Sequence, residues 1–359
     1  MINRSRFMVY GGIGNHAFDQ SVLEIANNLT GLSLKFTHVW HQRFPDGESA
    51  FGLEKFQQIP DKDIIIFSCP INDKLENELE DMITACKWQY GAKSVTVVLT
   101  FLRYRRQDHE EKQQEITRLR WFIFKLKNIG ADRIVVTETH SLKNTRKFCE
   151  DCEMKLFVCD PTPQFAEAIK GTISSSGLEK VRIYSPDYGS VGRAITLAKL
   201  IGTTVVATPK ERLFGDDISI SSGFNEQEFI SRIHAEYGSE VSVSCNLAEI
   251  AGKQLWMRED EISTGGTSVS TSRLLRDHKA SGVHLIATHA VCTPGWKMKL
   301  FPDNGRQPFN SIWFGNIRPR GDGGSSYEES TGGRINEVDL SPAVAGTLVE
   351  VLQQISAES

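Results

Sequence analysis

The chain has 359 residues, 40% of them hydrophobic and 24% charged, and its formal net charge at pH 7 is -4. This composition predicts a globular protein of about two domains, and the negative charge balance excludes the basic surface that general nucleic-acid binding requires. The residues before Gly11 contain only a short apolar run, so we expect neither a signal peptide nor a membrane span, and a cytoplasmic location.

Seven cysteines are scattered through the sequence, and an odd number in a chain of this size predicts reduced thiols rather than a disulfide framework. Only Cys149 and Cys152 have a spacing typical of metal ligands. Because no second pair accompanies them, this spacing favours a structural role over a zinc site.

Apolar, β-rich runs alternate with helical periodicity, which predicts the α/β class with a parallel sheet covered by helices on both faces. The expected strands are 7–10, 63–69, 94–100, 133–137, 182–185 and 284–288. Between the third and fourth of these, Leu119, Phe122 and Leu126 recur at helical spacing and Gly130 follows as a stop signal. This crossover is therefore predicted to be a helix.

The sequence Asp-Pro-Thr-Pro at 160–163 ends one strand-like run, and a new alternation of helices and strands begins after it. We therefore expect one domain over 1–160 and a second over 161–340. A stretch crowded with glycine, serine and charge, 318–334, is predicted to be a loop before an apolar helix over 342–352.

Gly12, Gly14 and Ala17 form a G-x-G-x-x-A pattern between a predicted strand and a helix, a pattern found in dinucleotide-binding folds. The next strand-like run, 37–40, carries no acidic residue that would hold a ribose hydroxyl. The pattern therefore favours a tight strand-to-helix turn.

The segment 257–267 is the most informative part of the sequence. Three successive acids, Glu259 to Glu261, precede a Ser-Thr-Gly-Gly-Thr run that opens a predicted helix. Backbone N–H groups at a helix N-terminus can surround a phosphate, and the carboxylates can accept hydrogen bonds from vicinal sugar hydroxyls, directly or through a magnesium ion. From these residues alone, a solvated acidic turn with an ordinary helix cap is an equal alternative.

This segment resembles the ribose-phosphate loop of type I phosphoribosyltransferases and of the related phosphoribosyl pyrophosphate synthetases. Other runs, in order along the chain, are similar to the synthetases only. Residues 44–48 match an ATP-binding turn, and 104–108 match a second ATP segment. Residues 137–140 match a strand end with a metal-binding histidine, and 185–189 match a metal-binding aspartate turn. Residues 210–212 match a catalytic flexible loop.

The resemblance implies two tandem type I phosphoribosyltransferase-like domains, with a C-terminal helix at 341–355 that returns to the first. It implies transfer of the β,γ-pyrophosphoryl group of ATP to the anomeric hydroxyl of a phosphorylated ribose, with Mg2+ as cofactor, by a homo-oligomer (dimer or hexamer). The residue roles that it implies are catalysis by Lys210 and Arg212, ATP binding by Phe44, Asp46, Glu48, Arg106, Gln107 and Asp108, ribose-phosphate binding by Glu259, Asp260, Ser263, Thr264, Gly265, Gly266 and Thr267, and metal binding by His140 and Asp187.

The acceptor segment departs from the family pattern: Ser263 stands where an aspartate is common, and Glu259 replaces the first of two aspartates. Glu211 also replaces a basic residue of the flexible loop. Ribose 5-phosphate, the usual acceptor of the family, is expected first. The alternative is a 5-substituted ribose such as ADP-ribose, whose nucleotide would contact Trp256, Arg258, Trp313 and Arg318.

Two other functions are open from the sequence. A phosphoribosyltransferase that consumes the activated sugar is disfavoured, because it does not need the ATP segments. A non-catalytic regulatory homologue need not keep together the four residues Lys210, Arg212, His140 and Asp187, all of which are present.

Overall fold

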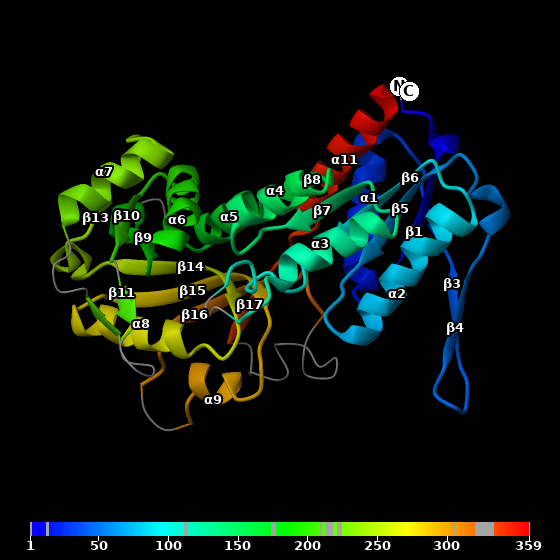
Figure 1. Cartoon of the computed structure of the whole chain (residues 1–359). Coiled ribbons are helices and arrows are strands. Elements are labelled where there is room, and N and C mark those ends of the chain that lie inside the picture. Colours follow the sequence, from blue (N-terminus) through cyan, green and yellow to red (C-terminus); the bar gives the residue numbers. More distant parts are fainter. Residues whose placement is uncertain are drawn as a thin grey trace. The chain divides into compact units, whose positions relative to one another are not determined.

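The chain folds into two compact units, each built on a parallel sheet. The computed structural model describes residues 2–11, 14–110, 114–173, 177–208, 210–212, 218–220, 225–303, 306–319 and 334–358, without the side chains of 210–212 and 218–220. The first unit comprises Met1–Pro161, Ile317–Pro319 and Leu340–Ser359, and the second comprises Thr162–Asn316 and Arg320–Asp339. The predicted α/β class is confirmed (Figure 1).

The sheet of the first unit has six parallel strands in the order β2-β1-β5-β6-β7-β8. Its strands are β1 (Phe7–Gly11), β2 (Phe36–Thr37), β5 (Asp63–Ser68), β6 (Ser94–Leu99), β7 (Arg133–Thr137) and β8 (Lys155–Cys159). Every residue of β5, β6 and β7 is buried, as expected of central parallel strands that are covered on both faces.

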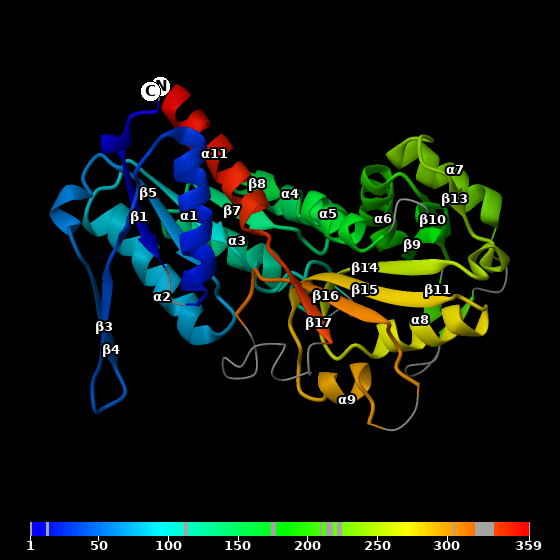
Figure 2. The ribbon, with the colours of Figure 1, turned by 180° about the vertical axis from the view of Figure 1, so that it is seen from behind.

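Helices cover both faces of this sheet. They are α1 (His16–Thr30), α2 (Asp73–Thr84), α3 (Arg118–Asn128), α4 (Leu142–Asp151) and α11 (Ser341–Ala357). Met8, Ile66 and Val97 pack in one core with apolar residues of α2, α3 and α4. On the opposite face α1 and α11 lie side by side (Figure 2), and α11 also contacts β7 and β8. The predicted C-terminal helix is thus present, and it continues beyond residue 352 because Ile355 is still buried.

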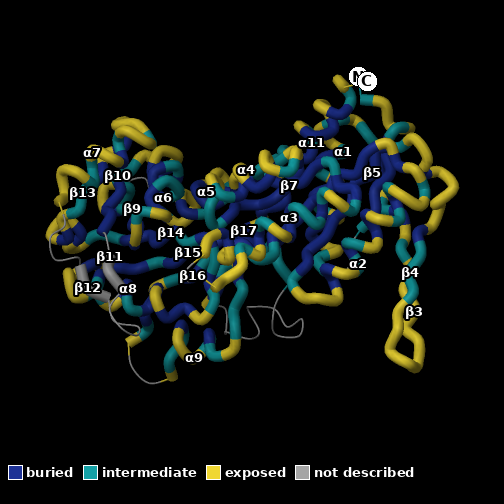
Figure 3. The backbone as a smooth tube through the Cα atoms, in the orientation of Figure 1, coloured by how far each residue is buried: buried dark blue, intermediate teal, exposed yellow. Residues whose placement is uncertain are grey.

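A two-stranded antiparallel hairpin follows β2. It consists of β3 (Val39–Arg43) and β4 (Ser49–Leu53), with Val39 opposite Leu53 and Arg43 opposite Ser49. Most residues of β3 are exposed, and only Leu53 of β4 is buried (Figure 3). The loop 44–48 at its tip is therefore carried away from the core.

The sheet of the second unit has seven parallel strands in the order β13-β10-β9-β14-β15-β16-β17. Its strands are β9 (Val181–Ser185), β10 (Thr204–Ala207), β13 (Val243–Ser244), β14 (Gln254–Ile262), β15 (Gly282–Ala290), β16 (Ser311–Gly315) and β17 (Ile335–Val338). A small antiparallel pair, β11 (Lys210–Arg212) and β12 (Ile218–Ile220), follows β10.

Helices accompany the second sheet in the part of the unit that the structure describes. They are α5 (Thr162–Thr172), α6 (Tyr188–Ile201), α7 (Glu226–Tyr237), α8 (Gly266–Asp277) and α9 (Trp296–Leu300). Val269 of α8 and Trp296 of α9 share a core with Leu255 and Leu285 of the two longest strands. The helices α5 and α6 pack together, and α6 contacts β9, β10 and β14.

The order of strands reverses direction once in each sheet. The reversal lies between β1 and β5 in the first unit and between β9 and β14 in the second. Open α/β sheets bind their ligands beyond the carboxyl ends of the strands, at such reversals. No helix in the described ranges is long and apolar enough to cross a membrane.

Candidate active site

The predicted second ATP segment, 104–108, directly follows the carboxyl end of β6. Its first residue, Tyr104, has a φ of 60°, and the N–H of Gln107 donates to the Tyr104 carbonyl across 2.8 Å, which closes a turn. The turn leaves Arg106 and Gln107 exposed, whereas Asp108 is buried. Arg106 and Gln107 are therefore accessible to a ligand, and Asp108 belongs to the frame beneath them.

Asp108 joins the ATP segment to the predicted metal-binding histidine on the neighbouring strand end. Its Oδ2 accepts a hydrogen bond from His140 Nδ1 at 3.2 Å, and its Oδ1 accepts one from His109 Nδ1 at 2.6 Å. Asn144 donates through Nδ2 to the Asp108 carbonyl. Burial opposes ionisation of Asp108, but the hydrogen bonds from His140 and His109 outweigh it and hold its pKa below the usual range.

A buried carboxylate, Glu76 on α2, holds the beginning of the same segment. Glu76 pairs with Arg103, accepts a hydrogen bond from Tyr104 Oη at 2.9 Å and contacts Lys125 Nζ at 2.5 Å. Arg118 donates to Tyr104 Oη and lies 4.0 Å above the ring of Tyr104. Burial raises the pKa of Glu76, but the hydrogen bonds from Lys125 and Tyr104 outweigh it and the net shift is downward. An ionised Glu76 thus fixes the Tyr104 turn.

The predicted ATP turn 44–48 is the loop of the β3–β4 hairpin. The Phe44 N–H donates to the Glu48 carbonyl at 2.8 Å, and the Glu48 N–H donates to Asp46 Oδ1 at 3.0 Å. Gly47 has a φ of 95°, which suits glycine. These hydrogen bonds give the loop a defined backbone. All five of its residues are exposed, so their side chains face solvent.

In the second unit, Asp187 lies directly beyond the carboxyl end of β9, at the reversal of strand order. It is the N-cap of α6, and its Oδ1 accepts a hydrogen bond from the Ser190 N–H at 2.8 Å. Ser185 donates through Oγ to the Asp187 carbonyl. Asp187 is exposed, so its carboxylate is held in place by the helix and is accessible to a ligand.

The three acids, Glu259 to Glu261, lie in the last part of β14. They do not form the solvated acidic turn that was the alternative from the sequence. Asp260 is buried with 6% of its surface exposed, and Glu259 and Glu261 are half-buried. The alternation along the strand places Asp260 on the face opposite to that of its two neighbours.

The small-residue loop 263–267 links β14 to α8. Gly265 is the N-cap of α8 with a φ of 79°, and a Cβ at this position would lie 2.7 Å from Leu300. Both the backbone conformation and the space therefore require glycine. Ser263 Oγ lies 3.2 Å from Thr293 Oγ1, and the Gly266 N–H points to Thr264 Oγ1 at 3.4 Å. The loop thus leads into a helix N-terminus of the kind that binds phosphates.

Lys210 and Arg212 lie in β11, which follows β10, the neighbour of β9. Lys210 pairs with Ile220 and Arg212 with Ile218 through the backbone. Their side chains, and residues 213–217 of the predicted flexible loop, lie outside the described part of the chain. The same holds for Gly12 of the G-x-G-x-x-A pattern and for 320–333 of the glycine-rich loop.

Two residues considered for ADP-ribose contacts are interior. Trp256 has 3% of its surface exposed and stacks on His284 with ring centroids 4.3 Å apart. Arg258 is fully buried, donates to Thr288 Oγ1 and lies over the ring of Phe165. These contacts give both side chains a role in packing within β14.

Sequence reasoning missed Glu76, His109 and Asn144 as members of the candidate site. Glu76 lies on a helix with many acids, and only its burial distinguishes it. Asn144 lies one turn into α4, where an exposed position is expected. Their contacts with Arg103, Tyr104 and Asp108 join segments far apart in sequence, so no local pattern marks them.

Comparisons with known proteins confirm the resemblance expected from the sequence. Residues 9–130 match the model of the N-terminal domain of ribose phosphate pyrophosphokinase. The chain is 28% identical to the ribose-phosphate pyrophosphokinase of Mycoplasma pneumoniae, over 70% of this chain and 68% of that protein. It is 25% identical to the enzyme of the same name from Sulfurisphaera tokodaii, over 79% and 85%.

The fold is also that of a solved relative. The phosphoribosylpyrophosphate synthetase of Mycobacterium smegmatis superposes with a TM-score of 0.71 at 19% identity, and the match covers 99% of this chain and 100% of that protein. The two sheets described above therefore have the architecture of a type I phosphoribosyltransferase-like fold.

Proposed function

We propose that this chain, a divergent member of the phosphoribosyl pyrophosphate synthetase family, transfers the β,γ-pyrophosphoryl group of ATP to the anomeric hydroxyl of ribose 5-phosphate, with Mg2+ as cofactor. AMP and phosphoribosyl pyrophosphate are then the products. The names of the relatives support the reaction class, and the positions of the candidate residues support its assignment to this chain.

The observation that carries the proposal is where the candidate residues lie in the two sheets. Apart from the hairpin loop, they follow the carboxyl ends of β6, β7, β9, β10 and β14 or complete the end of β14 itself. The strands β10, β9 and β14 are direct neighbours, so the basic pair, the aspartate turn and the phosphate-type loop share one edge of the second sheet. Ligands of such sheets bind at this edge.

The end of β14 and the start of α8 form the proposed binding site for the acceptor sugar. In the proposal, the N–H groups of 264–267 bind the 5-phosphate, because they lie at the positive end of the α8 helix dipole. Asp260 accepts hydrogen bonds from the ribose diol, and Glu259, on the opposite face of β14, is the second carboxylate that the resemblance assigns to the ribose. Asp260 is buried and held by the strand, so it contributes a fixed carboxylate rather than a mobile one.

The segments 44–48 and 104–108 form the proposed binding site for ATP. Arg106 and Gln107 are exposed on the Tyr104 turn and bind the triphosphate and the adenine, while the Glu76 and Asp108 contacts hold that turn in place. Phe44 of the hairpin is 39% exposed and offers an aromatic face to the base, with Asp46 and Glu48 as hydrogen-bond acceptors beside it.

Two described residues, His140 in the first unit and Asp187 in the second, have the chemistry of ligands for a magnesium ion that arrives with ATP. Asp187 presents an exposed carboxylate, the ligand type that Mg2+ prefers. His140 uses Nδ1 for Asp108, an arrangement that orients a histidine ligand and leaves Nε2 available. The ion supplies charge neutralisation on the phosphate oxygens. Lys210 and Arg212 stabilise the negative charge that develops as AMP leaves.

A competition experiment tests this function and its alternatives. The purified chain is incubated with ATP, Mg2+ and equimolar ribose 5-phosphate and ADP-ribose, and the products are identified by mass. We expect the diphosphorylated ribose 5-phosphate to dominate, because Trp256 and Arg258 are interior. Dominant diphosphorylation of ADP-ribose overturns the acceptor assignment, and absence of any product supports a non-catalytic homologue. Sedimentation of the same sample tests the homo-oligomer that the resemblance implies.

A further inference from the structure

Three side chains of α7 hold the first residue of α6. This residue, Tyr188, directly follows Asp187, and its Oη donates a hydrogen bond to Glu236 Oε2. The Arg232 guanidinium lies over the Tyr188 ring, 4.3 Å from its centroid. The Phe229 ring meets the Tyr188 ring edge-on, with the two centroids 5.8 Å apart. Residues 229, 232 and 236 recur at helical spacing, so one face of α7 holds Tyr188.

The turn that begins at Tyr188 is weak by sequence. The first five residues of α6 include Gly189 and Gly192, and glycine destabilises a helix because it loses the most backbone freedom on folding. Asp187 is exposed, and its Oδ1 is held by the Ser190 N–H of this same turn. The position of the Asp187 carboxylate therefore depends on whether the turn stays formed.

The helices α6 and α7 also meet at a second point. A Cβ at Gly192 would lie 2.7 Å from the Tyr237 ring, so glycine allows the two helices to come this close. The buried residue of α7 is Ile233, and the rest of the helix is half-buried or exposed. The contacts with Tyr188 are therefore a large part of what holds α7 to the second unit.

We infer that Tyr188 is a positioning residue, which uses its contacts with α7 to keep the first turn of α6 formed and so fixes the Asp187 carboxylate for a divalent cation. The inference rests on the metal-binding role proposed for Asp187 and adds the device that orients this ligand. Residues that orient a metal ligand typically change metal affinity by about 10- to 100-fold when they are replaced. Coupling between sites is reciprocal, so a cation held by Asp187 also stabilises the docking of α7.

Binding of Mn2+ to the full chain tests this role without turnover. Free Mn2+ is measured by electron paramagnetic resonance in the presence of α,β-methylene-ATP, which cannot release AMP. Tyr188→Leu removes the ring and the hydroxyl but keeps an apolar side chain that suits a helix, and it should bind Mn2+ about tenfold more weakly than the wild type. Tyr188→Phe keeps the ring contacts with Arg232 and Phe229 and should stay within about threefold of the wild type.

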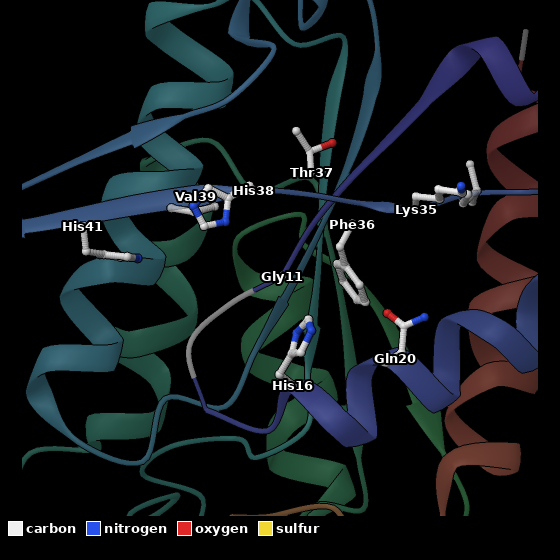
Figure 4. A pocket seen from close by; sticks show the side chains of 10 residues that line it. Gly11, His16, Gln20, Lys35, Phe36, Thr37, His38, Val39 and His41 are labelled. Atoms are coloured by element: carbon white, nitrogen blue, oxygen red, sulfur yellow. The ribbon is translucent and has the colours of Figure 1, made fainter.

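The matched control is Phe36→Leu in the first unit. Phe36 is half-buried like Tyr188, and it meets the Phe67 ring edge-on with centroids 5.3 Å apart. It lines a cavity at the start of the β3–β4 hairpin (Figure 4), and none of the described lining residues is a candidate active-site residue. Phe36 shares no contact partner with Tyr188, so Mn2+ affinity of this variant should stay within about twofold of the wild type.

Hydrogen exchange of α7, followed by mass spectrometry, separates positioning from a general loss of stability. In the wild type and in Phe36→Leu, Mn2+ with the ATP analogue should slow the exchange of the amides of 226–237. Tyr188→Leu should abolish this slowing, because the link between Asp187 and α7 is then removed.

Two results overturn the inference: wild-type Mn2+ affinity in Tyr188→Leu, or exchange in α7 that responds to the cation equally in this variant and in the wild type. Asp187→Asn distinguishes this failure from a failure of the proposed function. If Asp187→Asn weakens Mn2+ binding and Tyr188→Leu does not, only the positioning role is wrong. If Asp187→Asn leaves Mn2+ binding unchanged, the metal-binding role of Asp187 is wrong and the inference falls with it.

Discussion

Replacing Asp19 with asparagine should remove a large part of the pH dependence of stability. Asp19 lies on α1 with 2% of its surface exposed, and its Oδ1 atom has no hydrogen-bond partner among the described residues. Burial raises the pKa of its carboxyl from 3.8 to about 8. The folded chain therefore keeps Asp19 protonated at neutral pH.

The unfolded chain ionises this carboxyl near its ordinary pKa, whereas the folded chain keeps the proton until the pH approaches about 8. The protonated carboxyl thus makes its full contribution to the free energy of unfolding below about pH 4, and this contribution is lost as the pH rises through the folded pKa. A difference of about four pKa units sets an upper bound of about 6 kcal/mol for this loss. Local hydration of a charged Asp19 reduces it to a few kcal/mol.

Urea unfolding of the wild type and Asp19→Asn at pH 5 and pH 8 measures the effect. Asparagine has the same shape and does not titrate. The free energy of unfolding of the variant, relative to that of the wild type, should therefore be higher at pH 8 than at pH 5 by about 2 kcal/mol or more. Asp61→Asn is the control, because Asp61 is exposed and asparagine tolerates its φ of 62°. A relative stability of Asp19→Asn that is the same at both pH values would refute the reasoning.

Three further predictions concern the candidate active site. Lys210→Ala should lower kcat about a hundredfold or more with little change in ATP binding, and normal turnover of this variant, measured by AMP release, would remove the assigned role. Asp260→Asn should raise the KM for ribose 5-phosphate or abolish turnover, whereas a loss confined to ATP affinity, measured by calorimetry, would contradict its role at the ribose. Glu76→Gln should cost about 1–3 kcal/mol in urea unfolding and weaken ATP binding, since it loosens the Tyr104 turn; unchanged ATP affinity would show that the turn does not depend on Glu76.

The sequence predicted most of the α/β framework because its strands are continuous apolar runs. The buried isoleucines of β5 and the helical spacing in α3 are local signals that the fold retains. The loop 263–267 was also marked locally, by small residues before a helix. The sequence did not predict that the acids 259–261 lie in a strand. Consecutive acids are typical of exposed segments, whereas β14 is held in the sheet by pairing with β9 and β15.

The contacts that hold the candidate site were hidden for a different reason. His140 was predicted from resemblance, but its bond to Asp108 joins the ends of two different strands, and Glu76 reaches the ATP segment from a separate helix. Such pairs carry no spacing signal, so only the folded chain reveals them.

The fate of the β-phosphorus of ATP tests the central claim most directly. The chain is incubated with ribose 5-phosphate, Mg2+ and ATP labelled at the β-phosphorus, with Lys210→Ala as a matched control, and the labelled products are separated. Because attack is proposed at the β-phosphorus, the label should appear in the sugar product, together with one unlabelled AMP per sugar. Label retained in ADP would show transfer of the γ-phosphoryl group alone and would contradict the account.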